Sequence, residues 1–298
     1  MSLSQIDFAN IPAPAVIEPL DFNTILAAMK ADLLARDATL NAIILESEPI
    51  TKLLEVCAYR ELMVRQRVND GAHANMLAYA VGSDLDQLGA NHGVARLTIT
   101  PADTTQNPPL AAVMETDALF RDRIRLSLYA RTTAGPVQQY RFYALSAHAD
   151  VLDVSVTSPN PGDVVLTVLS RTGSGVPAQA VLDAVLAVCN ADMVRPLTDH
   201  VLVQAALIRN YSVTIALTVY PGPDPITVQA ASLQAVTDYC AIHHALGHDI
   251  TRAGLIAAAT VQGVQNVLLT APTADMGLDE LHASYATSIA VTIAGTAI

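Results

Sequence analysis

The segment CAIHHALGHD, residues 240–249, holds the densest group of ionisable side chains in the chain. Its ionisable members are His243, His244, His248 and Asp249. His244 and His248 are four residues apart, a spacing that puts two imidazoles on one helix face and suits a metal ion. The pattern allows one function class, a soluble metal-dependent hydrolase. Two features favour a structural role instead: Gly247 marks the expected helix end, where histidines bond free carbonyls, and the segment has no glutamate to act as general base.

Two other patterns resemble cofactor-binding or catalytic sequences but lack essential members. Gly173-Ser174-Gly175 stands between an expected strand and an expected helix, yet it has neither the third glycine nor the Lys-Ser/Thr pair of nucleotide-binding loops. Asp84 and Asp86 lie at an expected helix start, where free amides and the positive end of the dipole attract acids. We therefore predict no catalytic residue, no cofactor-binding residue and no metal ligand.

Arginines are the remaining candidates for recognition. Arg60, Arg65 and Arg67 carry the rigid guanidinium fork that suits carboxylates at an interface. A second group forms a locally basic stretch in an acidic protein. Its members are Arg121, Arg123, Arg125 and Arg131. This stretch is either a solvated face that pairs with Asp117 and Asp122, or a cationic strip that meets an acidic neighbouring subunit.

The element that positions the first arginines is a helix predicted from about Thr51 to Val68. Its apolar residues recur near a 3.6-residue period, and Glu61 precedes Arg65 by four residues, the favourable order for a helical ion pair. The recurring apolar residues are Leu53, Leu54, Cys57, Ala58, Leu62 and Met63. The pattern predicts an amphipathic helix with a charged outer face.

Two shorter helices are predicted to follow. The first runs from Ala72 to Val81, and the glycine after it is suited to the left-handed conformation that closes a helix. The second is capped by Ser83 or Asp84, since Gln87 stands three residues after the aspartate at capping-box spacing, and Gly93 ends it. Compact helices joined by tight corners favour a docking element over a flexible linker.

The order of the expected elements predicts the α+β fold class: a helical N-terminal domain followed by two small α/β subdomains. The prolines near the N-terminus favour an extended arm, which either lies along its own domain or reaches a neighbouring subunit. The predicted divisions are the arm at 1–20, the helical domain at 21–96, a loop and connecting helix at 97–130, and α/β subdomains at 131–205 and 206–298.

The two α/β subdomains contain an internal echo. Residues 141–159 align without gaps to residues 254–272, and five of the nineteen positions are identical. Both segments predict a helix, a tight corner, a strand and a proline stop. In the first subdomain the helix is predicted at Val137–Ala147, the strand at Val151–Thr157 and a further helix at Pro177–Cys189. The echo is either a duplicated module or a chance match in a composition rich in Ala and Val.

The last residues, Thr287–Ile298, alternate apolar with small or polar side chains and predict a strand at a sheet edge. An edge strand offers unpaired backbone groups, so this strand either pairs within its own sheet or adds a strand from another subunit.

Composition limits the classes of partner. The formal net charge is −12, with 28 acidic and 16 basic side chains, so the electrostatic term in nucleic-acid binding is repulsive overall. No apolar run approaches the roughly 18 residues that span a bilayer. The N-terminus lacks a basic leader with an apolar core, so secretion by that route is not expected. Three widely spaced cysteines, Cys57, Cys189 and Cys240, are predicted to be reduced core thiols.

The segment from Tyr59 to Leu97 carries a family resemblance. Its order of residues resembles the baseplate J-like wedge proteins of contractile phage tails and related injection machines, as does the segment VRPLTDHV from Val194. The matching positions are Arg60-Glu61, Arg65, Asn69, Leu77, Tyr79-Ala80, Gly82, Asp84-Leu85-Asp86, Leu88, Gly93-Val94 and Arg96.

The resemblance implies a structural subunit and not an enzyme, located in a virion tail baseplate or tail-like particle and assembled in the bacterial host cytoplasm. Its implied partners are further copies of itself, other wedge proteins and tail tube or hub proteins, without nucleic acid, membrane or cofactor. It also implies a helical bundle within 21–96 and ring contacts within 131–298. The interface residues predicted on this basis are Arg60, Arg65, Arg67, Leu77, Tyr79, Asp84, Leu85, Asp86, Arg121 and Arg125.

Overall fold

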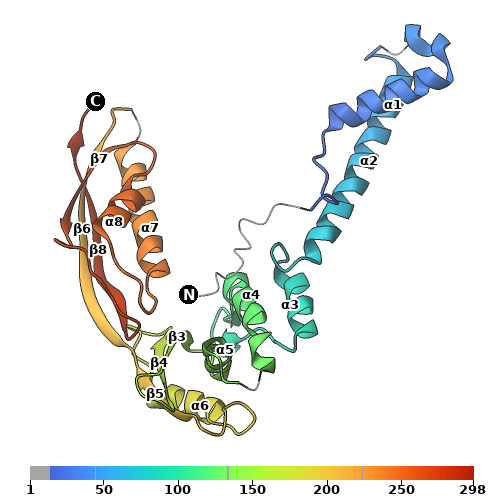
Figure 1. Ribbon diagram of the computed structural model, residues 1–298. Helices are drawn as coiled ribbons and strands as arrows, with labels where there is room; N and C mark the ends of the chain where they lie inside the picture. The colour runs from blue at the N-terminus through green and yellow to red at the C-terminus, as the bar shows by residue number, and fades with distance from the viewer. Residues whose placement is uncertain (1–13, 44, 133, 223) are drawn as a thin grey trace. The chain divides into compact units, whose positions relative to one another are not determined.

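The computed structural model describes residues 14–298 except 44, 133 and 223 (Figure 1). The chain forms two compact units: the first runs to Arg96 and also takes Thr116–Arg121, and the second contains Leu97–Glu115 and Asp122–Ile298. Helices dominate the first unit, whereas the second combines helices with small sheets. This arrangement confirms the α+β fold class. The five predicted domain boundaries remain predictions.

Two long helices build most of the first unit. Helix α1 (Phe22–Arg36) packs against α2 (Pro49–Ala74), and the 3₁₀ helix η2 (Ala38–Ile43) lies between them in the sequence. Asp21 caps α1, because its side chain accepts the amide N–H of Thr24 at 2.7 Å. This cap therefore sets the start of α1 locally.

Helix α2 continues for 26 residues, beyond the predicted end at Val68. The second helix predicted from Ala72 to Val81 is wrong, since residues 76–79 form turns. Local contacts sustain the extra turns: Gln66 donates to Asp70 at 2.7 Å, and Asn75 donates to the Gly71 carbonyl at 2.8 Å. Polar residues that favour a break in isolation are satisfied inside this helix.

The part of the predicted arm that the structure describes, residues 14–20, lies along α2 of its own chain. The side chain of Asn69, which is buried, donates to the Glu18 carbonyl at 2.9 Å and accepts the Glu18 amide at 3.1 Å. The Glu18 carboxylate also meets Arg65 at 3.2 Å. Residues 1–13 of the arm lie outside the described residues.

Helix α3 (Gly82–Asn91) has one predicted and one unexpected end. At its C-terminus Gly93 is left-handed, with φ 73°, and the Val94 amide bonds the Gly89 carbonyl at 2.9 Å, as in a Schellman motif. The capping box predicted at its N-terminus is absent. Val81 is the cap residue, and no side-chain hydrogen bond caps the helix from this position. Instead, Asp117 from a distant segment accepts the Gly82 amide at 3.1 Å.

The second unit begins with a small antiparallel pair, β1 (Thr98–Thr100) and β2 (Val113–Met114). Helix α4 (Asp117–Leu126) follows, and the 3₁₀ turn η3 (Tyr129–Arg131) comes after it. The first half of α4 belongs to the first unit and its second half to the second.

The first α/β module is a mixed three-stranded sheet with two helices. Its elements are α5 (Val137–Ala147), β3 (Val151–Thr157), β4 (Asp163–Ser170), α6 (Gln179–Cys189) and β5 (His200–Ala205). The strand order is β3-β4-β5, with β3 antiparallel and β5 parallel to the central β4. Helix α5 and strand β3 have the predicted bounds, because each follows a clear apolar period between proline, glycine or aspartate boundaries.

The second module repeats this design. Its elements are β6 (Leu207–Val219), α7 (Pro225–Ile242), α8 (Arg252–Ala259), β7 (Val264–Ala271) and β8 (His282–Thr296). The order is β7-β6-β8, with β7 antiparallel and β8 parallel to the central β6. Figure 1 shows α7 and α8 together on one face of this sheet. Strand β8 is at the edge of the sheet in the described part of the chain, which confirms its predicted position.

The two modules have equivalent contacts in a permuted chain order. Helix α5 packs on β3 and α6, and correspondingly α8 packs on β7 and α7. The echoed segments, α5–β3 and α8–β7, therefore occupy equivalent places. In the first module this pair precedes the central strand, whereas in the second it follows the central strand and its helix. A duplication remains a prediction, and the equivalent topology is the observation that supports it.

Burial corrects one prediction about the cysteines. Cys189 and Cys240 are buried in the two modules, and burial raises the pKa of the Cys189 thiol to about 12. Cys57 is exposed on α2, so its prediction as a core thiol is wrong. The apolar period that includes Cys57 is divided between two sides of α2: Ala58 is buried, whereas Leu53, Cys57 and Met63 are exposed.

Candidate functional site

Helix α2 presents a row of exposed apolar side chains. Leu53, Val56 and Met63 are exposed, and Val64 retains 64% of its accessible surface. The buried residues of the same helix, Thr51, Ala58 and Asn69, lie on the opposite side. The outer face of α2 therefore holds apolar side chains as well as the predicted charged ones. The apolar period predicted from the sequence leaves out Val56, Val64 and Val68. These three valines were the sequence signal that the outer side of α2 carries apolar side chains.

The exposed face follows the spacing of a helix–helix seam. Leu53, Val56, Arg60, Met63 and Arg67 succeed one another at alternating intervals of three and four residues. We call this surface the α2 face. Side chains at such positions lie in one line along a helix and fit between the side chains of a second helix.

Two arginines interrupt the apolar residues of the α2 face. Arg60 and Arg67 are both exposed, and within the described residues neither forms an ion pair. Arg65, on another side of the helix, differs because it pairs with Glu61 at 2.5 Å and with Glu18 at 3.2 Å. These acids raise the pKa of Arg65, chiefly through the bond from Glu61. The α2 face therefore combines apolar surface with uncompensated positive charge.

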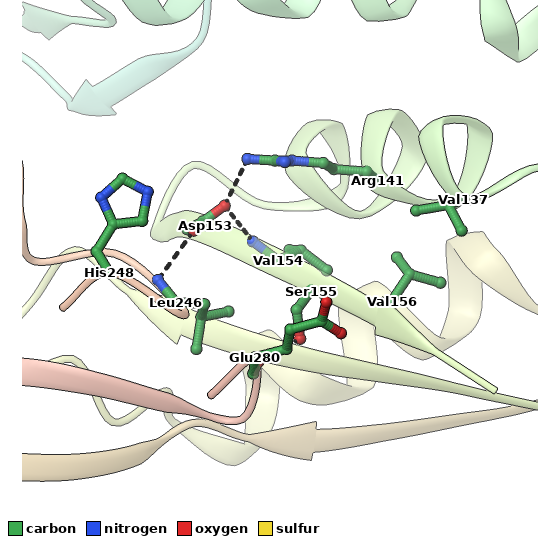
Figure 2. A pocket seen from close by; sticks show the side chains of 9 residues that line it. All are labelled: Val137, Arg141, Asp153, Val154, Ser155, Val156, Leu246, His248 and Glu280. Carbon is green, nitrogen blue, oxygen red and sulfur yellow. Dashed lines mark hydrogen bonds and ion pairs between the residues drawn. The ribbon is translucent and has the colours of Figure 1, made fainter. Parts of the chain in front are cut away.

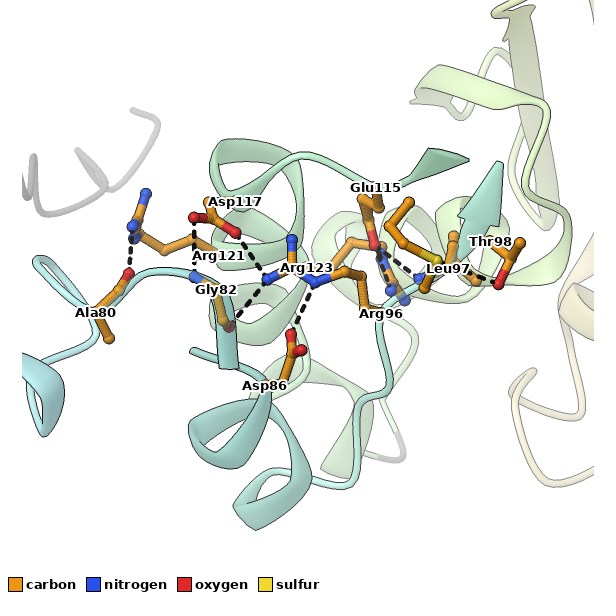
Figure 3. Close-up of polar contacts among 11 residues, drawn as sticks. Ala80, Gly82, Asp86, Arg96, Leu97, Thr98, Glu115, Asp117, Arg121 and Arg123 are labelled. Carbon is orange, nitrogen blue, oxygen red and sulfur yellow. Dashed lines mark hydrogen bonds and ion pairs between the residues drawn. The ribbon is translucent and has the colours of Figure 1, made fainter. Parts of the chain in front are cut away.

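A polar network fixes α3 within the first unit (Figure 3). Arg96 bonds Asp86 and Asp117 at 2.7 Å each, and its guanidinium lies 4.8 Å from the centre of the Phe120 ring. Asp117 also accepts the Gly82 amide, and this bond is the main cause of the lowered pKa of Asp117. The network joins the start and the middle of α3, and the chain that follows it, to the first turn of α4.

Arg121 holds the turn between α2 and α3. Its Nε donates to the Leu77 carbonyl at 2.7 Å, and a terminal nitrogen donates to the Ala80 carbonyl at 2.8 Å (Figure 3). Tyr79, in the same turn, places its ring 4.9 Å from that of His73. The predicted basic strip is thus engaged within the chain at this point.

A buried ion pair lies in the second unit. Arg123 donates to Glu115 from Nε at 2.9 Å and from a terminal nitrogen at 2.8 Å (Figure 3). The two side chains retain 5% and 1% of their accessible surface. Glu115 also accepts the Leu97 amide at 3.2 Å, so it ties the start of β1 to α4. Of the two acids predicted to pair with the basic strip, Asp122 bonds Arg125 at 3.1 Å and Asp117 bonds Arg96 instead.

The histidine segment does not form the predicted helical pair, because α7 ends at Ile242. His243 stacks on Tyr239 and bonds its carbonyl at 2.9 Å, whereas His244 bonds the Ser284 carbonyl at 2.5 Å. Asp249 accepts the Leu278 amide at 2.7 Å. Across residues 14–298, gaps excepted, no three metal-ligating side chains are grouped as an ion would require. His243 therefore bonds the end of its own helix, whereas His244 and Asp249 bond the segment that leads into β8 and the start of that strand.

A groove of about 230 Å³ lies where the two modules meet (Figure 2). Val137, Val156 and Leu246 supply apolar lining, and Arg141 and Glu280 supply charge. Asp153 at its floor bonds Arg141 at 2.8 Å and accepts the Leu246 amide at 3.1 Å. The Nε of Arg141 is buried without a hydrogen-bond partner. We call this the module groove.

Comparison with known proteins decides the family. The family models for the Baseplate J-like N-terminal domain and the Baseplate J-like central domain match residues 46–103 and 132–205. Baseplate protein J of Escherichia phage P2 is 44% identical over 297 residues, covering 98% of this chain and 98% of that protein. The chain belongs to the Baseplate J-like family.

This Baseplate J-like chain is a structural subunit of a phage tail baseplate and assembles with other baseplate components. A solved structure, the six-fold symmetrised cryo-EM structure of the anti-feeding prophage baseplate, is similar at 16% identity with a TM-score of 0.40. That likeness covers 59% of this chain and 44% of the other, and it carries no weight in the assignment. In the described part of the chain, no helix has the length and hydropathy needed to cross a membrane.

The predicted interface residues of this Baseplate J-like chain fall into three groups. Arg60 and Arg67 lie on the α2 face, and Asp84 is also exposed. Leu85 is fully buried in the first unit and offers no surface to a partner. The others are engaged within the chain, by the bonds and ring contact given above for Arg65, Leu77, Tyr79, Asp86, Arg121 and Arg125. An interface role for any of them remains a prediction.

Proposed function

We propose that this chain is a wedge subunit of a contractile tail baseplate and that its α2 face binds a helix of another wedge protein. The observation that carries the proposal is the exposed α2 face itself. Leaving several large apolar side chains in water on one helix is unfavourable, and an amphipathic helix that covers them recovers about 25 cal/mol per Å² of buried apolar surface.

The charges of the α2 face favour a partner that is not a second copy of α2. Two α2 helices packed face to face would bring Arg60 and Arg67 of each close to those of the other, and the like charges would repel. A partner helix with acidic side chains opposite the two arginines gains two ion pairs instead. We therefore assign the α2 face to an acidic amphipathic helix of a different baseplate protein.

The remaining parts of the proposal concern the second unit and the particle. We propose that the α/β modules contact neighbouring copies around the tail tube, in six-fold symmetric wedges, with tube or hub proteins nearby. In this role the chain is a scaffold without enzymatic activity, cofactor, nucleic-acid partner or membrane partner. The net charge of −12 supports the absence of nucleic acid, because phosphate binding depends on clustered cations.

Coexpression with the products of adjacent genes tests the α2 face. Val56→Asp combined with Val64→Asp should abolish copurification of a wedge protein, and Arg60→Glu with Arg67→Glu should weaken it about tenfold or more. Both pairs of side chains are exposed, so the folded chain should keep its helix content by circular dichroism.

Leu45→Asp is the matched control, since Leu45 is exposed in the first unit but lies outside the α2 face. It should copurify like the unaltered chain. Retention of all wedge partners by the Val56→Asp, Val64→Asp variant would refute the assignment of the α2 face. A chain that joins no ring or tail particle with any coexpressed product would refute the wedge function itself.

A further inference from the structure

Strands β1 and β2 form a two-stranded sheet of their own, separate from the sheets of the two modules. Backbone bonds continue the pairing on both sides. The Glu115 amide donates to the Leu97 carbonyl at 2.9 Å, and Asp103 and Leu110 exchange two bonds of 2.9 Å each. We call this segment, residues 97–115, the β1–β2 hairpin. A two-stranded hairpin is marginally stable in water unless a third strand or a packed face is added.

The chain itself fixes both ends of the β1–β2 hairpin. At the base, the buried Glu115 carboxylate accepts the Leu97 amide at 3.2 Å and pairs with Arg123 (Figure 3). At the tip, Asp103 accepts the amide of Thr105 at 2.9 Å and its hydroxyl at 2.6 Å. A segment held in this way loses little conformational entropy when a partner covers it.

The second strand of the hairpin carries a continuous run of exposed apolar residues. Residues 110–114, Leu-Ala-Ala-Val-Met, are all exposed. Leu110, Val113 and Met114 retain 47%, 51% and 44% of their accessible surface. Because side chains of a strand alternate between its two faces, both faces of this strand lie in solvent. We call residues 110–114 the open strand.

The composition of the open strand does not fit its surroundings. A short continuous apolar run between turn residues or charges is typical of a strand buried on both faces, and here Pro109 and Glu115 bound the run. In the structure the same residues lie at the edge of a two-stranded sheet and in solvent. A partner that covers them would supply the environment that this composition fits.

The outer edge of the open strand offers backbone groups for pairing. The Glu115 amide points to β1, because it donates to the Leu97 carbonyl. Backbone groups of successive residues in a strand point to opposite sides, so the N–H and C=O of Met114 face the outer edge. Within the residues that the structure describes, no third strand joins this sheet. Such an edge fits an extended segment, since a helix bonds its own backbone.

We propose that a different baseplate protein adds an extended, uncharged segment to the open strand and extends the β1–β2 sheet to three strands. Asp103 is the only charged residue between Leu97 and Glu115 in the sequence, and its oxygens accept bonds from Thr105 and Gln106. A charged segment would lose hydration at this edge without gaining an ion pair. The partner segment is therefore uncharged and apolar.

The small size of the open strand argues against a free pair of identical chains as its occupant. Specific interfaces bury about 1,200–2,000 Å² in total, more than a five-residue strand supplies alone. The added segment therefore belongs to a protein that a further surface holds. The α2 face, assigned above to a different baseplate protein, is such a surface. The inference rests on that proposed function and adds a second point of contact.

Hydrogen exchange of the full chain, alone and in complex with the wedge protein that copurifies with it, tests the added strand. The Met114 amide should exchange at least about tenfold more slowly in the complex, because a hydrogen-bonded amide exchanges only when its bond opens. Val113→Asp should raise the dissociation constant of the complex at least about tenfold. Val176→Asp is the matched control, since Val176 has 54% of its surface exposed, lies outside the hairpin and should leave the constant unchanged.

Two substitutions at Met114 separate backbone pairing from side-chain contact. Met114→Pro removes the N–H at the outer edge and should abolish the protection of residues 110–114, whereas Met114→Ala keeps this donor and should retain most of it. The Glu115 amide should stay protected in both free variants, because its bond to Leu97 lies on the inner side of the hairpin. Equal loss in the two variants would overturn strand addition.

The remaining outcomes distinguish this inference from the proposed function. Unchanged exchange of residues 110–114 on complex formation, together with full affinity of Val113→Asp, would overturn the added strand. The wedge function would stand if Val56→Asp with Val64→Asp still abolished copurification. Protection of residues 110–114 in the purified chain at high concentration, without another protein, would show that the occupant is a second copy and would also overturn the inference.

Discussion

Replacement of Glu115 by Gln gives the sharpest test of the energetics of the second unit. The substitution keeps the shape of the side chain but removes its charge from a carboxylate with 1% of its surface exposed. Arg123 then stays buried beside a neutral amide in place of a carboxylate, and one of the bonds to its Nε and terminal nitrogen is lost. Breaking a buried pair in this way costs about 3–5 kcal/mol.

The same chain supplies a matched surface pair. Asp122 bonds Arg125 at 3.1 Å, but the Asp122 side chain is mostly exposed, so Asp122→Asn should cost about 0–1 kcal/mol. The Glu115→Gln loss is a large share of the roughly 5–15 kcal/mol that stabilises a typical domain. The difference between the two variants therefore isolates burial as the cause.

Urea unfolding followed by far-ultraviolet circular dichroism compares the two variants with the unaltered chain. Hydrogen exchange at the Leu97 amide gives a local measurement, since this amide donates to Glu115 at 3.2 Å and should lose protection in Glu115→Gln. Replacing Glu115 and Arg123 together by Leu and Met should recover much of the stability, because no charge stays buried. Equal unfolding midpoints for Glu115→Gln and Asp122→Asn would refute the reasoning.

Two predictions concern the first unit. Asp117→Asn should lower the free energy of unfolding at neutral pH by about 1 kcal/mol, because it weakens the cap of α3. The Gly82 amide lowers the pKa of Asp117 from its ordinary 3.8, so the stabilisation by the Asp117 carboxylate is present above pH 3.8 and is lost as the pH falls through the pKa of the folded chain. The difference in unfolding midpoint between Asp117→Asn and the unaltered chain should therefore shrink in acid. A difference below the pKa of the folded chain as large as that at pH 7 would contradict this. Gly89→Ala should cost about 1–3 kcal/mol, because the added methyl group meets the Phe120 ring and lies 2.8 Å from the Val94 carbonyl. A thermal unfolding midpoint equal to that of the unaltered chain would show that α3 can shift away from Phe120.

Local elements could be predicted well where the sequence carries both a period and its boundaries. Helix α5 and strand β3 begin and end at the predicted residues, and α6 ends at the predicted Cys189. Gly93 was assigned to the end of α3 because a left-handed residue there needs no Cβ, and its φ of 73° agrees. These features depend on residues within one or two turns of each other, which a single sequence displays directly.

The candidate surfaces were predicted only in part. Arg60 and Arg67 were placed at an interface from their side-chain chemistry, and the structure puts them on the exposed α2 face. Leu85, chosen from the same segment, is buried, since periodicity cannot distinguish an apolar residue that packs inside its unit from one that waits for a partner. The module groove had no sequence signal, because its lining comes from segments more than a hundred residues apart, such as Ser155 and Glu280.

The sequence by itself determined the family, the α+β class and most helices and strands, because residue order and short-range periodicity are local properties of the chain. Tertiary structure decided which polar groups are satisfied and which apolar faces stay uncovered. Asp117 caps α3 from 35 residues away, and Asn69 bonds the chain 51 residues before it. Such contacts depend on how the elements pack together. The α2 face and the module groove likewise depend on which side chains the packing of their units leaves uncovered.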